Sequence, residues 1–267
     1  MCIITLLTDF GLADAYVGVM KGVILTINPK ARIVDISHQV KPQNILQASY
    51  ILKTAYSYFP EQSIHVVVVD PGVGTDRSII ALKTNRHVFL APDNGVLSMV
   101  MHEAHPELAV NVTEKQYFLK TMSHTFHGRD IFAPVAAYLS TGIPIDVLGE
   151  SIPCDNIKKL PQISCHIAET GNIHGTIIHV DHFGNLITNI DYQALNYFGE
   201  NKQQLQTHIN GQCIKGISAC YEQVPMHHPL VLIGSSGYLE ISVHQGSAKQ
   251  YFHAGIHDPV FIDRMVS

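Results

Sequence analysis

The chain has 267 residues, of which 46% are hydrophobic and only 15% charged, and its formal net charge is −5. This composition excludes a disordered chain and predicts a compact globular protein that buries about 70–75% of its unfolded surface. Its basic residues are scattered singly, which argues against nucleic acid as a partner, and no apolar run reaches the roughly 20 residues of a membrane helix.

The first half of the chain alternates short apolar strands with amphipathic helices. We expect, in chain order, a strand at 3–7, a helix at 14–27, a strand at 33–36, a helix at 44–58, a strand at 64–69, a hairpin of 78–82 with 88–91, and a helix at 131–139. Alternation of this kind predicts an α/β domain with a mainly parallel sheet that is covered by helices on both faces.

The composition changes after Gly142 to proline, glycine and short polar stretches. We therefore expect an α/β domain at 1–150, a linker at 151–171 and a second domain at 172–267. In the second domain the apolar runs are short and closely spaced, at 175–181, 186–190, 230–233 and 238–243. Because no long helical stripe separates them, they predict an all-β barrel or sandwich.

One junction in the first domain stands out chemically. The four valines at 66–69 run directly into Asp70, the chain turns at Pro71-Gly72, and Arg77 follows. A carboxylate at the carboxyl end of a buried strand lies where open α/β sheets bind ligands, although Asp before Pro-Gly is also a common turn opener. A second cluster that contains His127, just before a predicted helix, favours the functional interpretation.

The spacing of the histidines and glycines does not support a metal site or a phosphate-binding loop. The chain has 17 histidines, but the pairs His124/His127 and His179/His182 lack the glutamate of a His-Glu-x-x-His motif. The glycines after Asp70 lack the Gly-Lys-Ser/Thr ending of a phosphate loop. We therefore expect no metal and no cofactor. The five cysteines form no Cys-x-x-Cys pair, and their odd number predicts reduced thiols and a cytoplasmic protein.

Six loops taken together form a more specific pattern. They are Thr8-Asp-Phe-Gly11, Asp70-Pro-Gly-Val-Gly-Thr-Asp-Arg77, Ala91-Pro-Asp-Asn-Gly95, Phe126-His-Gly-Arg-Asp130, Asp181-His-Phe-Gly-Asn185 and Gly234-Ser-Ser-Gly-Tyr-Leu-Glu240. In this order and spacing they resemble the S-adenosyl-L-methionine (SAM) hydroxide adenosyltransferase family, the adenosine-forming SAM hydrolases related to the fluorinase and chlorinase enzymes. The resemblance spans essentially the whole chain.

The resemblance implies a reaction and an assembly. Water or hydroxide attacks C5′ of the ribose of SAM, and L-methionine leaves through its sulfonium sulfur to give adenosine. The catalytic triad falls on Asp70, Arg77 and His127, and His127 could act as a general base or could only orient the water. The resemblance also implies a homotrimer with active sites between the N-terminal domain of one subunit and the C-terminal domain of its neighbour.

The same resemblance assigns the substrate contacts. Asp9 matches the carboxylate that holds the ribose hydroxyls, although on its own it could be a helix N-cap. The remaining contacts, most of them in the second domain, are Asp70, Asp181, Phe183, Asn185, Tyr221, Ser235, Glu240 and Val243. Taken singly, Phe183 and Tyr221 could be core residues, and the loop at 181–185 could be an ordinary hairpin turn.

Two alternatives to the hydrolase remain open. A SAM-dependent halogenase of the chlorinase type is compatible with Gly128, whereas fluoride chemistry is disfavoured because the fluorinase has serine at this place. A non-catalytic SAM- or adenosine-binding protein would keep the pocket without turnover. The set of Asp70, Arg77 and His127 favours water over halide. Gln43 and Ser236 replace an aromatic residue and an arginine of the fluorinase, which leaves the methionine contacts open.

Overall fold

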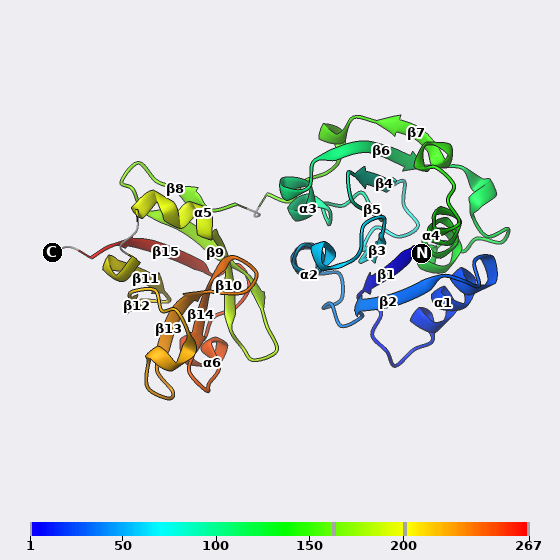
Figure 1. The fold of residues 1–267 in the computed structure, drawn as a ribbon. Helices are drawn as coiled ribbons and strands as arrows, with labels where there is room; N and C mark the ends of the chain where they lie inside the picture. The colour runs from blue at the N-terminus through cyan, green and yellow to red at the C-terminus, as the bar shows by residue number, and fades with distance from the viewer. Residues whose placement is uncertain (1, 162–163, 200–201, 266–267) are drawn as a thin grey trace. The chain divides into compact units, whose positions relative to one another are not determined.

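The chain folds into two compact units that meet in sequence between Leu160 and Pro161. The computed structural model describes residues 2–161, 164–199 and 202–265, and Figure 1 traces the two units. The expected linker at 151–171 contains the end of strand β7 (Gly149–Ile152) and a short 3-10 turn, Cys154–Asn156. Residues 162 and 163 of that segment lie outside the described residues.

The N-terminal unit is built on a seven-stranded sheet in the order β2-β1-β3-β5-β4-β6-β7. Its strands are β1 (Ile3–Thr8), β2 (Arg32–Ser37), β3 (Ile64–Val68), β4 (Ile79–Thr84), β5 (Val88–Pro92), β6 (Pro106–Val112) and β7. The pairs among β2, β1, β3 and β5 are parallel, and those from β5 to β7 are antiparallel. The expectation of a mainly parallel sheet is therefore wrong, because β6 and β7 add two antiparallel pairs to that of the expected hairpin of β4 with β5.

Helices cover both faces of this sheet, as the alternating pattern predicts (Figure 1). Helices α1 (Tyr16–Ile27) and α4 (Ala133–Ser140) pack on one face through residues such as Met20 and Val135. Helices α2 (Ile45–Ala55) and α3 (Ser98–Glu103) pack on the other face. The sequence pattern misses α3 and β6, because a helix of six residues is too short to show a clear period.

The C-terminal unit is an all-antiparallel sheet that is nearly closed into a barrel, so the barrel-or-sandwich expectation is confirmed. Its order is β12-β11-β15-β9-β10-β14-β13, with β8 paired to β9. The strands are β8 (His166–Ile167), β9 (Ile173–Val180), β10 (Leu186–Asp191), β11 (Leu205–Ile209), β12 (Gln212–Lys215), β13 (Pro229–Ile233), β14 (Tyr238–Val243) and β15 (Pro259–Arg264). A bridge between Ser218 and Leu232 brings the two edges together. Two short helices, α5 (Tyr192–Leu195) and α6 (Ala248–Phe252), complete the unit.

Strand direction in the N-terminal unit determines where its polar loops meet. β1 and β3 are adjacent and parallel, so the residues that follow them, Asp9 and Asp70, emerge at the same edge of the sheet. In an open α/β sheet this carboxyl edge is where ligands bind. The fold thus brings together two loops that are 61 positions apart in the chain.

A buried pair of histidines lies in the same unit, one on β3 and the other directly before β5. His65 and His87 are 0% and 2% exposed, and their rings lie 5.0 Å apart beside Tyr56 and Phe89. His65 Nδ1 contacts the hydroxyl of Thr5 at 2.8 Å, whereas neither ring nitrogen of His87 has a hydrogen-bond partner among the described residues. Burial lowers the pKa of His65 to about 3, and burial together with Arg86 lowers the pKa of His87.

We predict that this pair makes the protein sensitive to acid. In the unfolded chain both imidazoles take up a proton near pH 6.5, but in the native state burial lowers the pKa of both, that of His65 to about 3. Their contribution to stability is therefore complete above pH 6.5 and is lost as the pH falls, by up to about 1.4 kcal/mol per pH unit for each group. The variant His87→Phe should raise the melting temperature more at pH 5 than at pH 8.

The measurement is thermal unfolding of wild type and variant at the two pH values. Replacement of the exposed His102 by glutamine is the matched control, because this side chain is already in solvent. An equal shift of the melting temperature at pH 5 and pH 8 in His87→Phe would contradict the prediction.

Candidate active site

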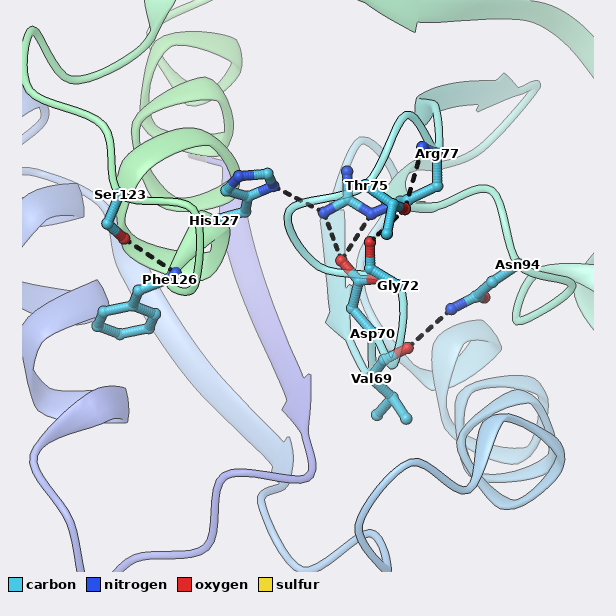
Figure 2. A network of polar contacts seen from close by, with 9 residues as sticks. All are labelled: Val69, Asp70, Gly72, Thr75, Arg77, Asn94, Ser123, Phe126 and His127. Carbon is cyan, nitrogen blue, oxygen red and sulfur yellow. Dashed lines mark hydrogen bonds and ion pairs between the residues drawn. The ribbon is translucent and has the colours of Figure 1, made fainter.

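Asp70 is held at the end of β3 by its neighbours on both sides. The side-chain amide of Asn94 donates to the carbonyl oxygen of Val69 at 2.9 Å, as Figure 2 shows. After Asp70 the chain turns tightly, and Gly74 adopts a positive φ of 81°. A Cβ at Gly74 would collide with the carbonyl oxygen of His124. Glycine is therefore required here, and the turn carries Arg77 back toward the carboxylate.

The three predicted catalytic residues are in direct contact (Figure 2). Arg77 donates from Nε to Oδ2 of Asp70 at 2.7 Å, and its Nη2 donates to the same oxygen and to Nδ1 of His127, the latter at 2.9 Å. The side chains of Arg77 and Asp70 are only 8% and 4% exposed. Oδ1 of Asp70 is buried without a hydrogen-bond partner among the described residues, so one strong acceptor remains open.

The contact with Arg77 determines which nitrogen of His127 carries the proton. A guanidinium can only donate hydrogen bonds, so Nδ1 accepts and holds no proton. Burial and the positive charge of Arg77 lower the pKa of His127 below its ordinary value of 6.5, and the ring is neutral at pH 7. The proton of the neutral ring is then on Nε2, which makes this nitrogen a hydrogen-bond donor.

The loop that carries His127 is fastened by Asp130. This carboxylate is fully buried and accepts from the backbone N–H of Ser123 at 2.7 Å and from Arg129 Nε at 2.5 Å. Ser123 Oγ in turn accepts from the backbone N–H of Phe126 at 3.0 Å. These bonds close the segment between Ser123 and Asp130 into a compact turn, so His127 is placed by a rigid support.

A hollow of about 610 Å³ opens beside these groups within the N-terminal unit, a volume in the range of small-molecule sites. It is lined by Asp9, Phe10, Tyr16, Pro42, Gln43, Val68, Asp70, Pro71, Val73, Thr125, Phe126, His127 and Gly128. Asp9 is not a helix cap, because α1 begins after Ala15 without a side-chain cap. Its Oδ2 instead accepts from the backbone N–H of Gln43 at 2.7 Å.

Aromatic rings form one wall of this hollow. Phe10, Tyr16 and Phe126 lie with ring centroids 5.1 to 5.9 Å apart. Gly128 sits against them, and a Cβ there would lie 3.2 Å from Phe126 and 3.3 Å from Phe10. A side chain at position 128 would therefore press on the aromatic wall.

The C-terminal unit places four of its predicted contact residues around a separate hollow of about 480 Å³. Its lining includes Phe183, Asn185, Tyr221 and Val243. Phe183 is 73% exposed, so it is not a core residue. Its ring is available to stack on a planar ligand.

The turn between β9 and β10 orients Asn185. Oδ1 of Asp181 accepts the backbone N–H groups of Phe183 and Asn185, and Oδ2 accepts the side-chain amide of Asn185 at 2.9 Å. Since a carboxylate only accepts, the Asn185 amide must present its NH₂ to Asp181. Asp181 thus organises the turn, and the amide oxygen of Asn185 is left as an acceptor.

Glu240 and Ser235 lie outside the lining of that hollow. Glu240 is 8% exposed and accepts from the hydroxyls of Tyr221 at 2.7 Å and Ser242 at 2.8 Å. Burial and the carboxylate of Glu240 raise the pKa of Tyr221 to about 12. Ser235 is exposed in the turn between β13 and β14. Glu240 therefore acts on the hollow by fixing the Tyr221 ring.

Two supporting residues, Asn94 and Asp130, were not singled out from sequence. Both belong to loops that carry the family resemblance, at 91–95 and 126–130. Asn94 binds a backbone carbonyl 25 positions away, and Asp130 binds the nearby Ser123 and Arg129 through a turn that sequence spacing does not reveal. Across the described ranges 2–161, 164–199 and 202–265, no three His, Cys, Asp or Glu side chains are arranged to hold a metal ion. In those ranges no helix is long and apolar enough to span a membrane.

Fold and site together define a class: a two-unit protein whose α/β part carries a carboxylate–guanidinium–imidazole cluster and whose β-barrel part carries an aromatic hollow. The N-terminal and C-terminal domain models of the SAM hydroxide adenosyltransferase family match residues 4–149 and 175–261. The chain belongs to this family.

Known relatives agree with this assignment. A protein of Methanocaldococcus jannaschii named (R)-S-adenosyl-L-methionine hydrolase is 36% identical over 97% of this chain and 95% of its own length. A fluorinase of an Actinoplanes species is 25% identical over 90% of each chain. The crystal structure of an uncharacterized conserved protein from Thermotoga maritima superposes with a TM-score of 0.90 at 38% identity, covering 98% of this chain and all of the other.

We predict opposite shifts of the His127 pKa when its two charged neighbours are removed. The charge of Arg77 lowers this pKa and that of Asp70 raises it. Arg77→Met should therefore raise the pKa of His127, and Asp70→Asn should lower it further. The measurement is an NMR titration of the His127 ring, whose signal is assigned by its loss in His127→Asn. Shifts of the same sign in both variants would contradict the geometry.

Proposed function

We propose that this protein hydrolyses SAM to adenosine and L-methionine by attack of water at C5′ of the ribose. The observation that carries the proposal is the contact of Asp70, Arg77 and His127 at the wall of a hollow that also contains Asp9. The chain's family membership and its similarity to proteins named SAM hydrolase support the same reaction.

The site provides both kinds of polar group that an attacking water needs. Nε2–H of His127 is a donor that can hold the water oxygen, and the unpartnered Oδ1 of Asp70 is an acceptor for one of its hydrogens. We therefore propose that His127 and Asp70 orient the water, with Asp70 accepting a hydrogen bond from it, and that the released proton passes to solvent while Asp70 keeps its charge beside Arg77. For His127 to act as the base, its ring would have to become positively charged beside Arg77, which its lowered pKa disfavours.

The electron balance of the step suits this environment. The water oxygen forms a bond to C5′, the C5′–S bond breaks, and its electron pair neutralises the sulfonium as methionine leaves. Because the positive charge of the substrate disappears, a carboxylate beside sulfur would stabilise the ground state more than the transition state. Polar groups placed at the nucleophile, as here, act where charge develops.

We assign recognition of the nucleoside to groups in both units. Asp9 would accept hydrogen bonds from the ribose hydroxyls. Phe183 would stack on adenine, and the amide oxygen of Asn185 would accept from its amino group. Asp181 would act through the turn that holds Asn185, and Glu240 through Tyr221, with Ser235 and Val243 as further contacts.

The halogenase alternative is less well supported. The relatives named hydrolase are more similar to this chain than the fluorinases are, and the three groups that handle water are in mutual contact. SAM is a substrate whose sulfonium is already a good leaving group, so we propose that no cofactor is needed. Because the number of cysteines is odd, we infer reduced thiols and a cytoplasmic location.

The decisive test is hydrolysis of SAM in ¹⁸O-water by protein treated with a chelator. We expect label in the 5′-hydroxyl of adenosine and no halogenated nucleoside when chloride is added. Asp70→Asn, Arg77→Met and His127→Asn should each slow adenosine release by about a hundredfold or more while SAM still binds. Binding of SAM without any adenosine would establish the non-catalytic alternative, and a 5′-chloronucleoside would establish the halogenase.

We further propose a homotrimer in which the catalytic hollow of one subunit works with the aromatic hollow of its neighbour. Mixing two inactive variants tests the arrangement directly. Asp70→Asn disables only the N-terminal unit, and a Phe183→Ala, Asn185→Ala double variant disables only the C-terminal unit.

Mixed trimers should regain activity if the two hollows come from different subunits, because some sites then receive two intact halves. Sedimentation equilibrium measures the subunit number in parallel. Mixed trimers that form but stay inactive would show that each subunit uses its own two units.

A further inference from the structure

The loop that carries Asp9 is held by a chain of polar contacts behind the hollow. Thr8 Oγ1 lies 2.8 Å from Nδ1 of His38, and the two residues are 0% and 3% exposed. Nε2 of His38 lies 3.1 Å from Oδ1 of Asp35, and the other oxygen of Asp35 lies 2.6 Å from Nζ of Lys21. This series of polar contacts thus runs from the buried end of β1 to the surface of the unit.

Each group in this series of contacts has a definite role as hydrogen-bond donor or acceptor. The nitrogen of His38 that faces Asp35 is off the line of a hydrogen bond, so the carboxylate acts through its charge and favours a proton on Nε2. A ring with its proton on Nε2 accepts at Nδ1 from the hydroxyl of Thr8. Thr8 Oγ1 accepts in turn from the backbone N–H of Phe10 at 3.3 Å.

His38 also holds the far side of the same loop. Its carbonyl oxygen accepts from the backbone N–H of Gly11 at 2.8 Å, and Gly11 has a φ of 67°. His38 therefore contacts Thr8, one residue before Asp9, and Gly11, two residues after it. The backbone N–H of Gln43 then orients the carboxylate itself.

We propose that His38 is a positioning residue that sets the direction of the Asp9 carboxylate toward the ribose hydroxyls. The proposal rests on the proposed function, which assigns those hydroxyls to Asp9. Functional groups must be held within about 0.5 Å of their working positions by well-packed neighbours. Removing either partner of the Thr8–His38 bond leaves the other buried group without that hydrogen bond, and the loop can relieve this only by moving.

The two nitrogens of the ring can be tested separately. In His38→Asn a polar group remains near the position of Nδ1, so the contact with Thr8 is kept. In His38→Gln a polar group reaches the position of Nε2 but the contact with Thr8 is lost. Thr8→Val removes the hydroxyl at nearly unchanged volume. His38→Gln and Thr8→Val should therefore behave alike, and His38→Asn should resemble the wild type.

The measurement is the affinity of the full-length protein for adenosine and for 2′,3′-dideoxyadenosine by calorimetry. The wild type should prefer adenosine, because only adenosine has the hydroxyls that Asp9 would bind. We expect the affinity ratio to fall by about fivefold or more in Thr8→Val and His38→Gln, and to stay within about twofold of wild type in His38→Asn.

The chain contains a matched control on the same strand. Thr5 and His65 form a second buried contact at 2.8 Å between Oγ1 and Nδ1, and neither residue lines the hollow. Thr5→Val should lower the melting temperature by a similar amount without changing the affinity ratio.

Three results would overturn the inference. Equal ratios in Thr8→Val and Thr5→Val would show that the His38 contact supports only stability. A reduced ratio in His38→Asn equal to that in His38→Gln would exclude the role of the Thr8 contact. A wild type that binds both nucleosides equally would remove the ribose role of Asp9, whereas the separate assay of adenosine from SAM reports on hydrolysis itself.

Discussion

The buried ion pair of Asp70 and Arg77 is the interaction on which the rest of the site depends. Both side chains are more than nine-tenths buried, and a charge left alone in such a place costs several kcal/mol. β3 must therefore end where the carboxylate meets the guanidinium, and the turn at Gly74 must bring Arg77 back to it. Because Arg77 still has a donor for His127, the same pair sets the protonation of the imidazole.

The two units offer different kinds of geometry for a site. The parallel part of the N-terminal sheet brings several loop ends to one edge, which suits a cluster of interacting charges. The C-terminal sheet is nearly closed, so its hairpin turns are held firmly and can present Phe183 and Asn185 in defined directions. In the proposed function the groups at the nucleophile lie on the N-terminal unit, and the groups that bind the nucleoside come from both units.

Local sequence patterns predicted much of this arrangement but not all of it. The strands at the N-terminus and at 64–69 and the hairpin of β4 with β5 follow from apolar runs and turn residues. The direction of β6 and β7 does not, because it depends on which strands pair after a short connection. In the C-terminal unit the pattern missed β11, β12 and β15, whose alternating burial is too brief to stand out among short polar segments.

By itself the sequence determined the two-part architecture, the family and the identity of the groups that face the substrate in the proposed reaction. These follow from strand ends, glycine turns and the order of six loops, which are properties of local stretches of chain. Only the tertiary structure decided that Nδ1 of His127 accepts from Arg77, that Oδ1 of Asp70 stays open, and that His38 stands behind Asp9. Those facts depend on contacts between residues 30 to 50 positions apart, and packing of the folded chain creates them.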